Sequence, residues 1–294
     1  MYTIKTLSNL TGVNPDTIRS WERRYDLLRP ERTDSGRRTY SDGDVEKLTL
    51  IAALLKSGHT ISHLAALSPD ELNALRASNP VSATQDLRQK ILTELEETVG
   101  RSDLQAFGKL ISSAITLLPP HDLADRILSP ILRTIGDRWS IDALDIGDEH
   151  AFTAVIKQCL MSVLPSPSWT NPGPVALFTT LADDHHELGA LMACHIAANS
   201  GFNCHYLGPN MPGDALLTHC QRIKAELLVV SLITSSDPAA VTGTLNSLAK
   251  KLQPVTQVWV GFGKHAPFKD ADFDSRIVTF NRFDPFHKRL VLLR

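Results

Sequence analysis

Five hydrophobic segments that alternate with helical patterns constrain the fold of this chain more than any other feature. They span residues 175–181, 202–207, 226–233, 257–261 and 276–280, and helices are expected after residues 187, 213 and 237. Strands that alternate with helices favour a doubly wound parallel sheet, because each connection must cross a face of the sheet. Residues 175–294 are therefore predicted to form a Rossmann-like α/β domain. In open sheets of this kind, ligands bind at the carboxyl ends of the strands.

The loop after the first predicted strand contains Asp184, His186 and Gly189, in the pattern Asp-x-His-x-x-Gly. A carboxylate two residues before an imidazole can hold one ring nitrogen, which directs the other nitrogen toward a metal ion. Gly189 lacks a Cβ and would let the backbone approach a large flat group. The same residues also fit a polar loop between a strand and a helix, with an aspartate as N-cap. From these residues alone, both interpretations stay open.

In this position the pattern resembles the cobalamin-binding motif of the methionine synthase and mutase superfamily. The resemblance extends over residues 175–294 and implies that His186 is the axial cobalt ligand in place of the lower base. The implied cofactor is cobalamin, with adenosylcobalamin as the expected form. Phe262 interrupts the Gly-Gly pair of that family and leaves open how the nucleotide tail fits. The residues that the resemblance assigns to cofactor binding here are Asp184, His186, Gly189, Ser231, Gly261 and Gly263.

Two short helical patterns joined by a turn at Gly12 open the chain. The first spans residues 3–10 and can begin at Thr3 as N-cap. The second follows Asn14, another N-cap, and runs to residue 25. Two such helices with a glycine-containing turn are typical of a helix-turn-helix. The second helix combines an apolar back with an arginine-rich front, as a helix in the major groove of DNA requires.

A second arginine-rich segment, residues 29–40, follows this motif and contains a tight turn at residues 34–36. Residues 1–40 hold eight Lys and Arg against five Asp and Glu, a local charge of +3 in a chain with a formal net charge of −2. This excess favours phosphate contacts, although an arginine face can also be merely solvated. The order of these features resembles the winged helix-turn-helix of the MerR family. It assigns operator contacts to Thr17, Arg19, Arg23, Arg24, Arg37, Arg38 and Tyr40.

The middle of the chain shows only helical periodicity, which predicts a small helix bundle. A linker is expected before it at residues 77–84, where Asn79 and Pro80 interrupt the pattern. No strand pattern occurs between the linker and residue 165. The bundle is therefore placed at residues 80–165.

Within the predicted bundle, Trp139 is followed after nine residues by Glu149 and His150. By themselves these residues fit a core tryptophan and a surface Glu-His pair. Directly before a cobalamin-like domain, their spacing resembles the helical cap of CarH- and LitR-like photoreceptor regulators, members of the MerR family. The resemblance implies that Trp139, Glu149 and His150 cover the upper, adenosyl face of the corrin. Ser140 stands where light-responsive relatives can have His, so a light-induced second imidazole ligand is not expected, and either a reversible light response or simple sensing of the cofactor is expected instead.

The amino-acid composition narrows the class of protein to which this chain can belong. With 43% hydrophobic and 21% charged residues, the chain of 294 residues has the balance of globular domains. It shows neither an apolar run of membrane-spanning length nor a signal peptide, so a cytoplasmic protein without a membrane partner is expected. Its four cysteines are scattered without a Cys-x-x-Cys pair, which predicts neither a zinc site nor a disulfide framework.

The prediction is a multidomain DNA-binding regulator. A winged helix-turn-helix, all-α with a small β wing, occupies residues 1–75, the helical bundle residues 80–165 and the Rossmann-like domain residues 175–294. Cobalamin would control its oligomerisation and its binding to double-stranded operator DNA. A homodimer or tetramer is expected because such readers bind paired half-sites. No enzymatic activity is expected. Two alternatives stay open: a corrinoid enzyme subunit or methyl carrier, and a MerR-like regulator whose C-terminal domain binds no cofactor.

Overall fold

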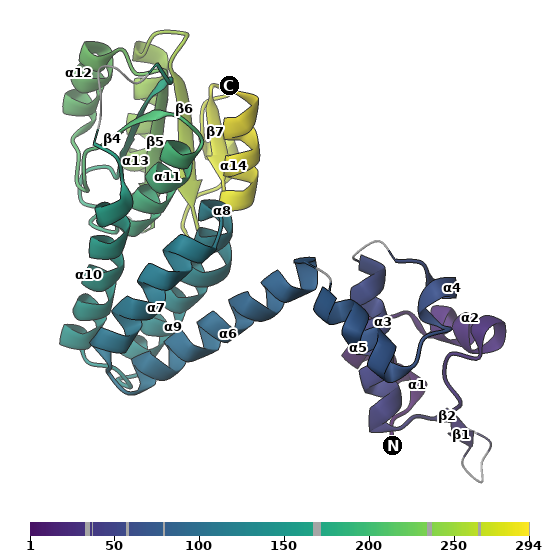
Figure 1. The fold of residues 1–294 in the computed structure, drawn as a ribbon. Coiled ribbons are helices and arrows are strands. Elements are labelled where there is room, and N and C mark those ends of the chain that lie inside the picture. The colour runs from purple at the N-terminus through teal and green to yellow at the C-terminus, as the bar shows by residue number, and fades with distance from the viewer. Residues whose placement is uncertain are drawn as a thin grey trace. The chain divides into compact units, whose positions relative to one another are not determined.

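The computed structural model describes residues 1–32, 36, 38–56, 59–78, 80–166, 172–233, 237–263 and 266–293 (Figure 1). Contacts between Cα atoms divide the chain into two compact units, Met1–Lys90 and Ile91–Arg294. The predicted multidomain class is confirmed, because a helix-turn-helix, a helical region and a parallel sheet follow one another. None of the helices in these ranges is long and apolar enough to span a lipid bilayer.

The first unit begins with the predicted helix-turn-helix, formed by α1 (Ile4–Thr11) and α2 (Pro15–Tyr25). The Thr3 hydroxyl accepts a hydrogen bond from a backbone N–H of the first turn and caps α1. Gly12 ends this helix with a φ of 70°, the left-handed conformation that glycine adopts without strain. The Asn14 side chain caps α2 in the same manner. The capping residues therefore set the turn between the two helices.

The wing and three further helices complete the first unit. β1 (Glu31–Arg32) and β2 (Arg38–Thr39) pair antiparallel as the arms of the predicted wing, and Asp34 and Ser35 of its turn lie outside the described residues. The helices that follow are α3 (Asp42–Lys56), α4 (Ile61–Leu64) and α5 (Pro69–Ser78). The most enclosed side chains of the shared core are Leu7, Ile18, Tyr40, Leu48, Ile51, Leu54, Leu64 and Leu72.

The linker predicted at residues 77–84 is wrong. Helix α5 extends to Ser78, and α6 (Pro80–Gly100) begins two residues later. Proline can occupy the first turn of a helix, because the N–H groups there have no acceptor within the helix. Pro80 therefore starts α6, and the boundary between the two compact units falls within this helix, after Lys90.

The helical part of the second unit is the predicted bundle. After α6 it contains α7 (Leu104–Leu117), α8 (Pro120–Leu123), the π-helical turn η1 (Ala124–Leu128), α9 (Ser129–Ser140) and α10 (Ile146–Val163). Apolar side chains at helical spacing face inward. Phe107 and Phe152 meet edge to face, with ring centroids 4.8 Å apart.

The predicted sheet has five parallel strands in the order β4-β3-β5-β6-β7. The strands are β3 (Val175–Thr179), β4 (Asn203–Tyr206), β5 (Leu227–Leu232), β6 (Gln257–Phe262) and β7 (Ile277–Phe280). The helices between and after them are α11 (Leu188–Asn199), α12 (Gly213–Ile223), α13 (Pro238–Lys251), the short 3₁₀ helix η2 (Asp270–Asp272) and α14 (Phe283–Leu292). β3 lies next to both β4 and β5, so its loop stands at the point where the strand order reverses.

The two faces of the sheet are covered differently (Figure 1). Helices α12 and α13 cover one face with their own core. On the other face, α11 and α14 share one continuous core with the bundle. The Asp125 carboxylate of η1 accepts hydrogen bonds from the N–H groups of Phe283 and Asp284, at 2.9 Å each. A bundle side chain therefore caps the last helix of the sheet domain.

Candidate functional site

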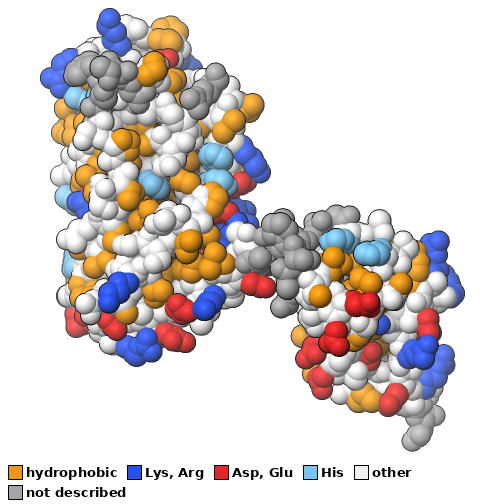
Figure 2. Space-filling model, viewed as in Figure 1, with side chains coloured by type: hydrophobic (Ala, Val, Ile, Leu, Met, Phe, Trp, Pro, Cys, Tyr) orange, Lys and Arg blue, Asp and Glu red, His pale blue; other side chains and the backbone are white. Residues whose placement is uncertain are grey.

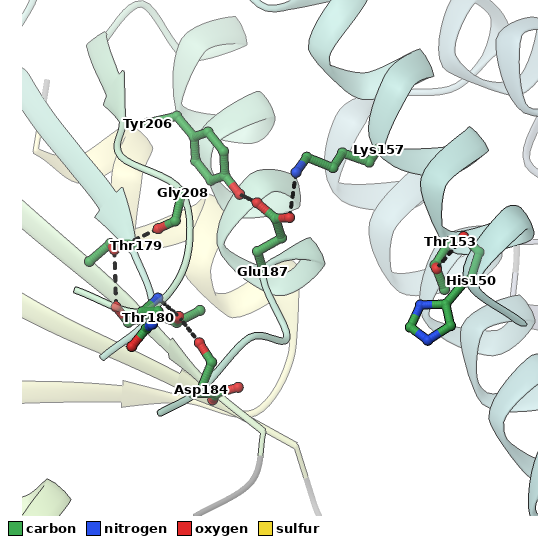
Figure 3. Close-up of polar contacts among 10 residues, drawn as sticks. His150, Thr153, Lys157, Thr179, Thr180, Asp184, Glu187, Tyr206 and Gly208 are labelled. Atoms are coloured by element: carbon green, nitrogen blue, oxygen red, sulfur yellow. Dashed lines mark hydrogen bonds and ion pairs between the residues drawn. The ribbon is translucent and has the colours of Figure 1, made fainter. Parts of the chain in front are cut away.

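The loop after β3 holds a buried carboxylate beneath a half-exposed imidazole. Asp184 Oδ1 accepts a hydrogen bond from the backbone N–H of His186 and lies 2.9 Å from His186 Nδ1. Its other oxygen accepts the N–H of Ile233, at 3.0 Å, at the end of β5. The Thr180 hydroxyl donates to the Asp184 carbonyl (Figure 3). Asp184 is 3% exposed, whereas the His186 side chain is 56% exposed. This pairing assigns Nε2 as the nitrogen that would coordinate a metal ion.

The charges at this pair support each other. Burial alone would raise the pKa of Asp184, but the hydrogen bonds from the His186 ring and the Ile233 backbone outweigh it and lower that pKa. The bond to Asp184 raises the pKa of His186, and the charge of Glu149 on α10 contributes in the same direction. A carboxylate of the bundle therefore acts electrostatically on an imidazole of the sheet domain.

Small residues line the carboxyl ends of β5 and β6 on the face that α11 covers. Ser231 pairs with Gly261 across the two strands. A Cβ on Gly189, in the first turn of α11, would lie 2.3 Å from Ser231 Oγ, whereas a Cβ on Gly261 or Gly263 would meet no atom of the described residues within 4 Å. The edge beside His186 therefore has room for a group that approaches the backbone closely.

Phe262 does not fill this space. Its strand neighbours Val260 and Gly261 point to opposite faces, and Phe262 lies on the face covered by α12 and α13. There its ring packs against Phe268 and Phe273, with centroid distances of 6.1 and 5.8 Å. The aromatic ring between the two glycines therefore lies on the opposite face of the sheet from them.

Replacing Gly189 with Ala is expected to lower the free energy of unfolding by about 1–3 kcal/mol, because the new Cβ overlaps Ser231 Oγ. Chemical denaturation measures the effect. The matched control is Gly243→Ala in α13, where a Cβ meets no described atom within 4 Å and helix propensity should stabilise the fold by about 0.5–1 kcal/mol. The loss should also shrink when Ser231 is first replaced with Gly; equal losses in both backgrounds would contradict the steric explanation.

The predicted cap residues lie at one end of the bundle. Trp139 is in the last turn of α9 and 48% exposed, Glu149 is in the first turn of α10, and His150 follows it. The His150 ring projects from α10 toward the domain that carries Asp184 (Figure 3). Ser140 has a local role, since its hydroxyl donates to the Asp137 carbonyl at 2.7 Å. Of these residues, Glu149 is the one whose charge reaches His186.

The predicted DNA surface lies on α2 and the wing. Arg19, Arg23 and Arg24 are exposed on α2, and Arg38 is exposed on β2. Thr17 is half-buried, and Arg37 lies outside the described residues. Figure 2 shows that the Lys and Arg side chains of this unit gather along one edge, away from most of its acidic side chains. A basic edge of this kind suits the phosphates of DNA.

The prediction for Tyr40 is wrong. Its side chain is fully buried, and its hydroxyl donates to Glu22 Oε1 at 2.6 Å. Burial and the bond to Glu22 raise the pKa of Tyr40 well above its usual value. The other Glu22 oxygen lies 3.3 Å from Arg38 Nε. Glu22, which the sequence did not single out, therefore ties the wing to α2, and Tyr40 is structural.

Replacing Glu22 with Ala is expected to destabilise the fold by about 1–3 kcal/mol, because the buried Tyr40 hydroxyl loses its acceptor. It should also weaken DNA binding, because Arg38 is released from α2. Chemical denaturation and titration of operator DNA measure the two effects, with the exposed Glu46→Ala as control. Adding Tyr40→Phe should recover part of the lost stability. If it recovers none, the unpaired Tyr40 hydroxyl is not the cause of the destabilisation.

Two parts of the chain match known protein families. Residues 2–71 match the family described as MerR HTH family regulatory protein, and residues 91–163 match the B12 binding domain. The HTH-type transcriptional repressor CarH of Myxococcus xanthus is 29% identical over 266 residues, which cover 88% of each chain. The repressor CarA of the same organism is 27% identical over 267 residues, which cover 90% of this chain and 88% of CarA.

A solved structure shares the fold of a large part of this chain. The monomethylamine corrinoid protein of Methanosarcina barkeri covers 70% of this chain and 99% of its own, with a TM-score of 0.55 and 17% sequence identity. At this identity the likeness concerns the fold alone.

These findings define a protein with a MerR-type helix-turn-helix domain that is followed in the sequence by a B12-binding domain. Residues 2–71 carry the MerR helix-turn-helix, and the chain is similar over most of its length to the CarH and CarA repressors. That both relatives are named as transcriptional repressors agrees with the expectation that the chain is not an enzyme.

The site residues fit a corrinoid rather than a bare metal ion. Among the described residues, no group of three or more His, Cys, Asp or Glu side chains could enclose a metal. A corrin supplies its own equatorial nitrogens, so one protein imidazole is sufficient. The oriented His186 provides that ligand, and the open face at Gly261 and Gly263 provides space beside it.

Proposed function

We propose that this protein is a transcriptional regulator whose binding to operator DNA is controlled by cobalamin. The observation that carries the proposal is the buried Asp184 carboxylate that holds Nδ1 of His186 at the carboxyl end of β3. It lies in the same compact unit as the helices that match the B12 binding domain. When bound, the cofactor supplies a cobalt centre that takes a nitrogen ligand. His186 would provide this ligand through Nε2, and Asp184 would keep the ring in place.

Adenosylcobalamin is the proposed form of the cofactor, because the cap end of the bundle presents apolar surface to a large group. Trp139 is 48% exposed, Ile141, directly after α9, is 72% exposed, and Ile146, the first residue of α10, is 57% exposed. Contiguous exposed apolar surface marks sites that bind a partner or ligand. The residues proposed to contact the cofactor are Trp139, Glu149, His150, Asp184, His186, Gly189, Ser231, Gly261 and Gly263.

The proposed partner of the first unit is double-stranded operator DNA. Tyr40 no longer belongs to the proposed DNA contacts. The residues proposed to contact the DNA are Thr17, Arg19, Arg23, Arg24, Arg37 and Arg38. A homodimer or tetramer is proposed because paired half-sites need paired readers. We also propose a cytoplasmic location, where such a regulator would meet its operator DNA.

One experiment tests the control by the cofactor. The full chain is loaded with adenosylcobalamin, and its visible spectrum, size-exclusion profile and operator affinity are compared in the dark, after green light and without cofactor. We expect a ligand-dependent change in both profile and affinity, because a cofactor shifts an equilibrium by its differential affinity for the two states. The absence of any spectral change on mixing would overturn the proposal. Identical profiles in the dark and after light would limit it to sensing of the cofactor without light.

A further inference from the structure

Three polar side chains join α10 of the bundle to the residue that follows His186. Lys157 Nζ lies 2.5 Å from Glu187 Oε1, and the Tyr206 hydroxyl donates to Glu187 Oε2 (Figure 3). The Glu187 side chain is only 15% exposed, so its ion pair is less screened than one on an open surface. One carboxylate is thus shared between the bundle and strand β4. We call these three residues the Glu187 clamp.

The clamp lies on the face of α10 that carries two cap residues. Lys157 follows His150 by seven positions and Glu149 by eight. Residues at these spacings share a helix face, and eight residues correspond to about 12 Å along the axis. Since α10 is one continuous helix, the contact of Lys157 with Glu187 fixes where its first turn stands.

The other end of the clamp is fixed to the loop of His186. The Glu187 N–H donates to the His185 carbonyl at 2.9 Å, and the Glu187 carbonyl accepts the N–H of Leu191 in α11. The Glu187 backbone therefore cannot move without disturbing the loop that Asp184 anchors. A shift of α10 along its axis would break the ion pair between Lys157 and Glu187.

We infer that Lys157, Glu187 and Tyr206 are positioning residues that set the separation between His186 and the cap residues on α10. They would thereby select the size of the upper group on a bound cobalamin. The inference rests on the proposed function and extends it to specificity. Discrimination is a difference between two affinities. A chain without the clamp would keep the His186 ligand but lose its preference for a bulky adenosyl group over a small methyl group.

The test uses the full chain, titrated in the dark with adenosylcobalamin and with methylcobalamin, followed by visible absorbance. We expect the parent to prefer adenosylcobalamin, and Lys157→Met and Glu187→Gln to lower the ratio of the two affinities by about fivefold or more, the lower end of couplings between sites. The spectrum of bound adenosylcobalamin should keep its His-ligated form. Lys157→Arg should retain the preference. Lys288→Met is the matched control, since Lys288 Nζ pairs with Asp284 Oδ2 at 2.7 Å on α14.

The results separate this inference from the proposed function. If the ratio of the two affinities is unchanged in both variants, or if the affinity for both cobalamins falls equally, the clamp has a merely structural role and the inference is overturned. A parent without preference would overturn it too. A parent that binds neither cobalamin would overturn the proposed function itself. Tyr206→Phe removes only a hydroxyl and serves as a second variant if the others fail to fold.

Discussion

His186→Ala is expected to abolish stable retention of cobalamin, because it removes the exposed imidazole that the buried Asp184 carboxylate holds. Replacing an outer-shell partner of a metal ligand typically weakens metal binding by about 10–100-fold. Removal of the ligand itself should exceed that range, whereas Asp184→Asn should fall within it. Gel filtration of the protein mixed with adenosylcobalamin in the dark, followed by the visible spectrum of the protein peak, measures retention.

The adjacent His185 provides the matched control. It is exposed and precedes His186 directly, so His185→Ala removes an imidazole from the same loop without touching the Asp184 pair. It should bind cobalamin like the parent. If His186→Ala retained the cofactor with the parent spectrum, ligation by this residue would be wrong. If His185→Ala lost it instead, the two histidines would have to be exchanged in the assignment.

The second large effect is expected on DNA binding when Arg23 and Arg24 are both replaced with Ala. Both side chains are exposed on the last turn of α2. Loss of an arginine that reads a base should cost about 1–3 kcal/mol, and loss of a phosphate contact should lower the salt slope of binding by about one. Titration of the DNA upstream of the protein's own gene, at several salt concentrations, separates the two contributions.

Arg133→Ala is the control for this variant, because Arg133 is an exposed arginine on α9 of the other unit. It removes one positive charge from the chain but none from the predicted DNA surface. Parent-like affinity and salt slope are expected. Should the double variant bind as tightly as the parent, α2 would not be the reading helix.

The parts of the fold that the sequence predicted correctly depend on short-range patterns. Alternation of apolar segments with helices defines a parallel sheet, and capping residues such as Asn14 define helix starts. The linker at residues 77–84 failed because proline interrupts a helix interior but also starts a helix. Sequence pattern alone does not distinguish these two positions of Pro80.

The site, too, contains contacts that local sequence spacing predicts and contacts that it does not. Asp184 and His186 are two residues apart, so their pairing follows from local spacing. Tyr40 and Glu22 are 18 residues apart, and Lys157 and Glu187 are 30 apart. Contacts at such separations depend on how the elements pack, and in a single sequence Tyr40 could be exposed beside the wing arginines or buried. The role of Glu22 and the Glu187 clamp therefore required the structure.

The cap that Asp125 provides for α14 limits how this protein can be divided. Asp125 is in the π-helical turn of the bundle, yet its carboxylate accepts the first N–H groups of the last helix of the sheet domain. A recombinant fragment that starts at the first strand would leave these N–H groups without their acceptor, at a cost of about 0.5–2 kcal/mol. For the construction of chimeric regulators, bundle and sheet are therefore one transferable module, and the exchange point belongs in α6 near Lys90.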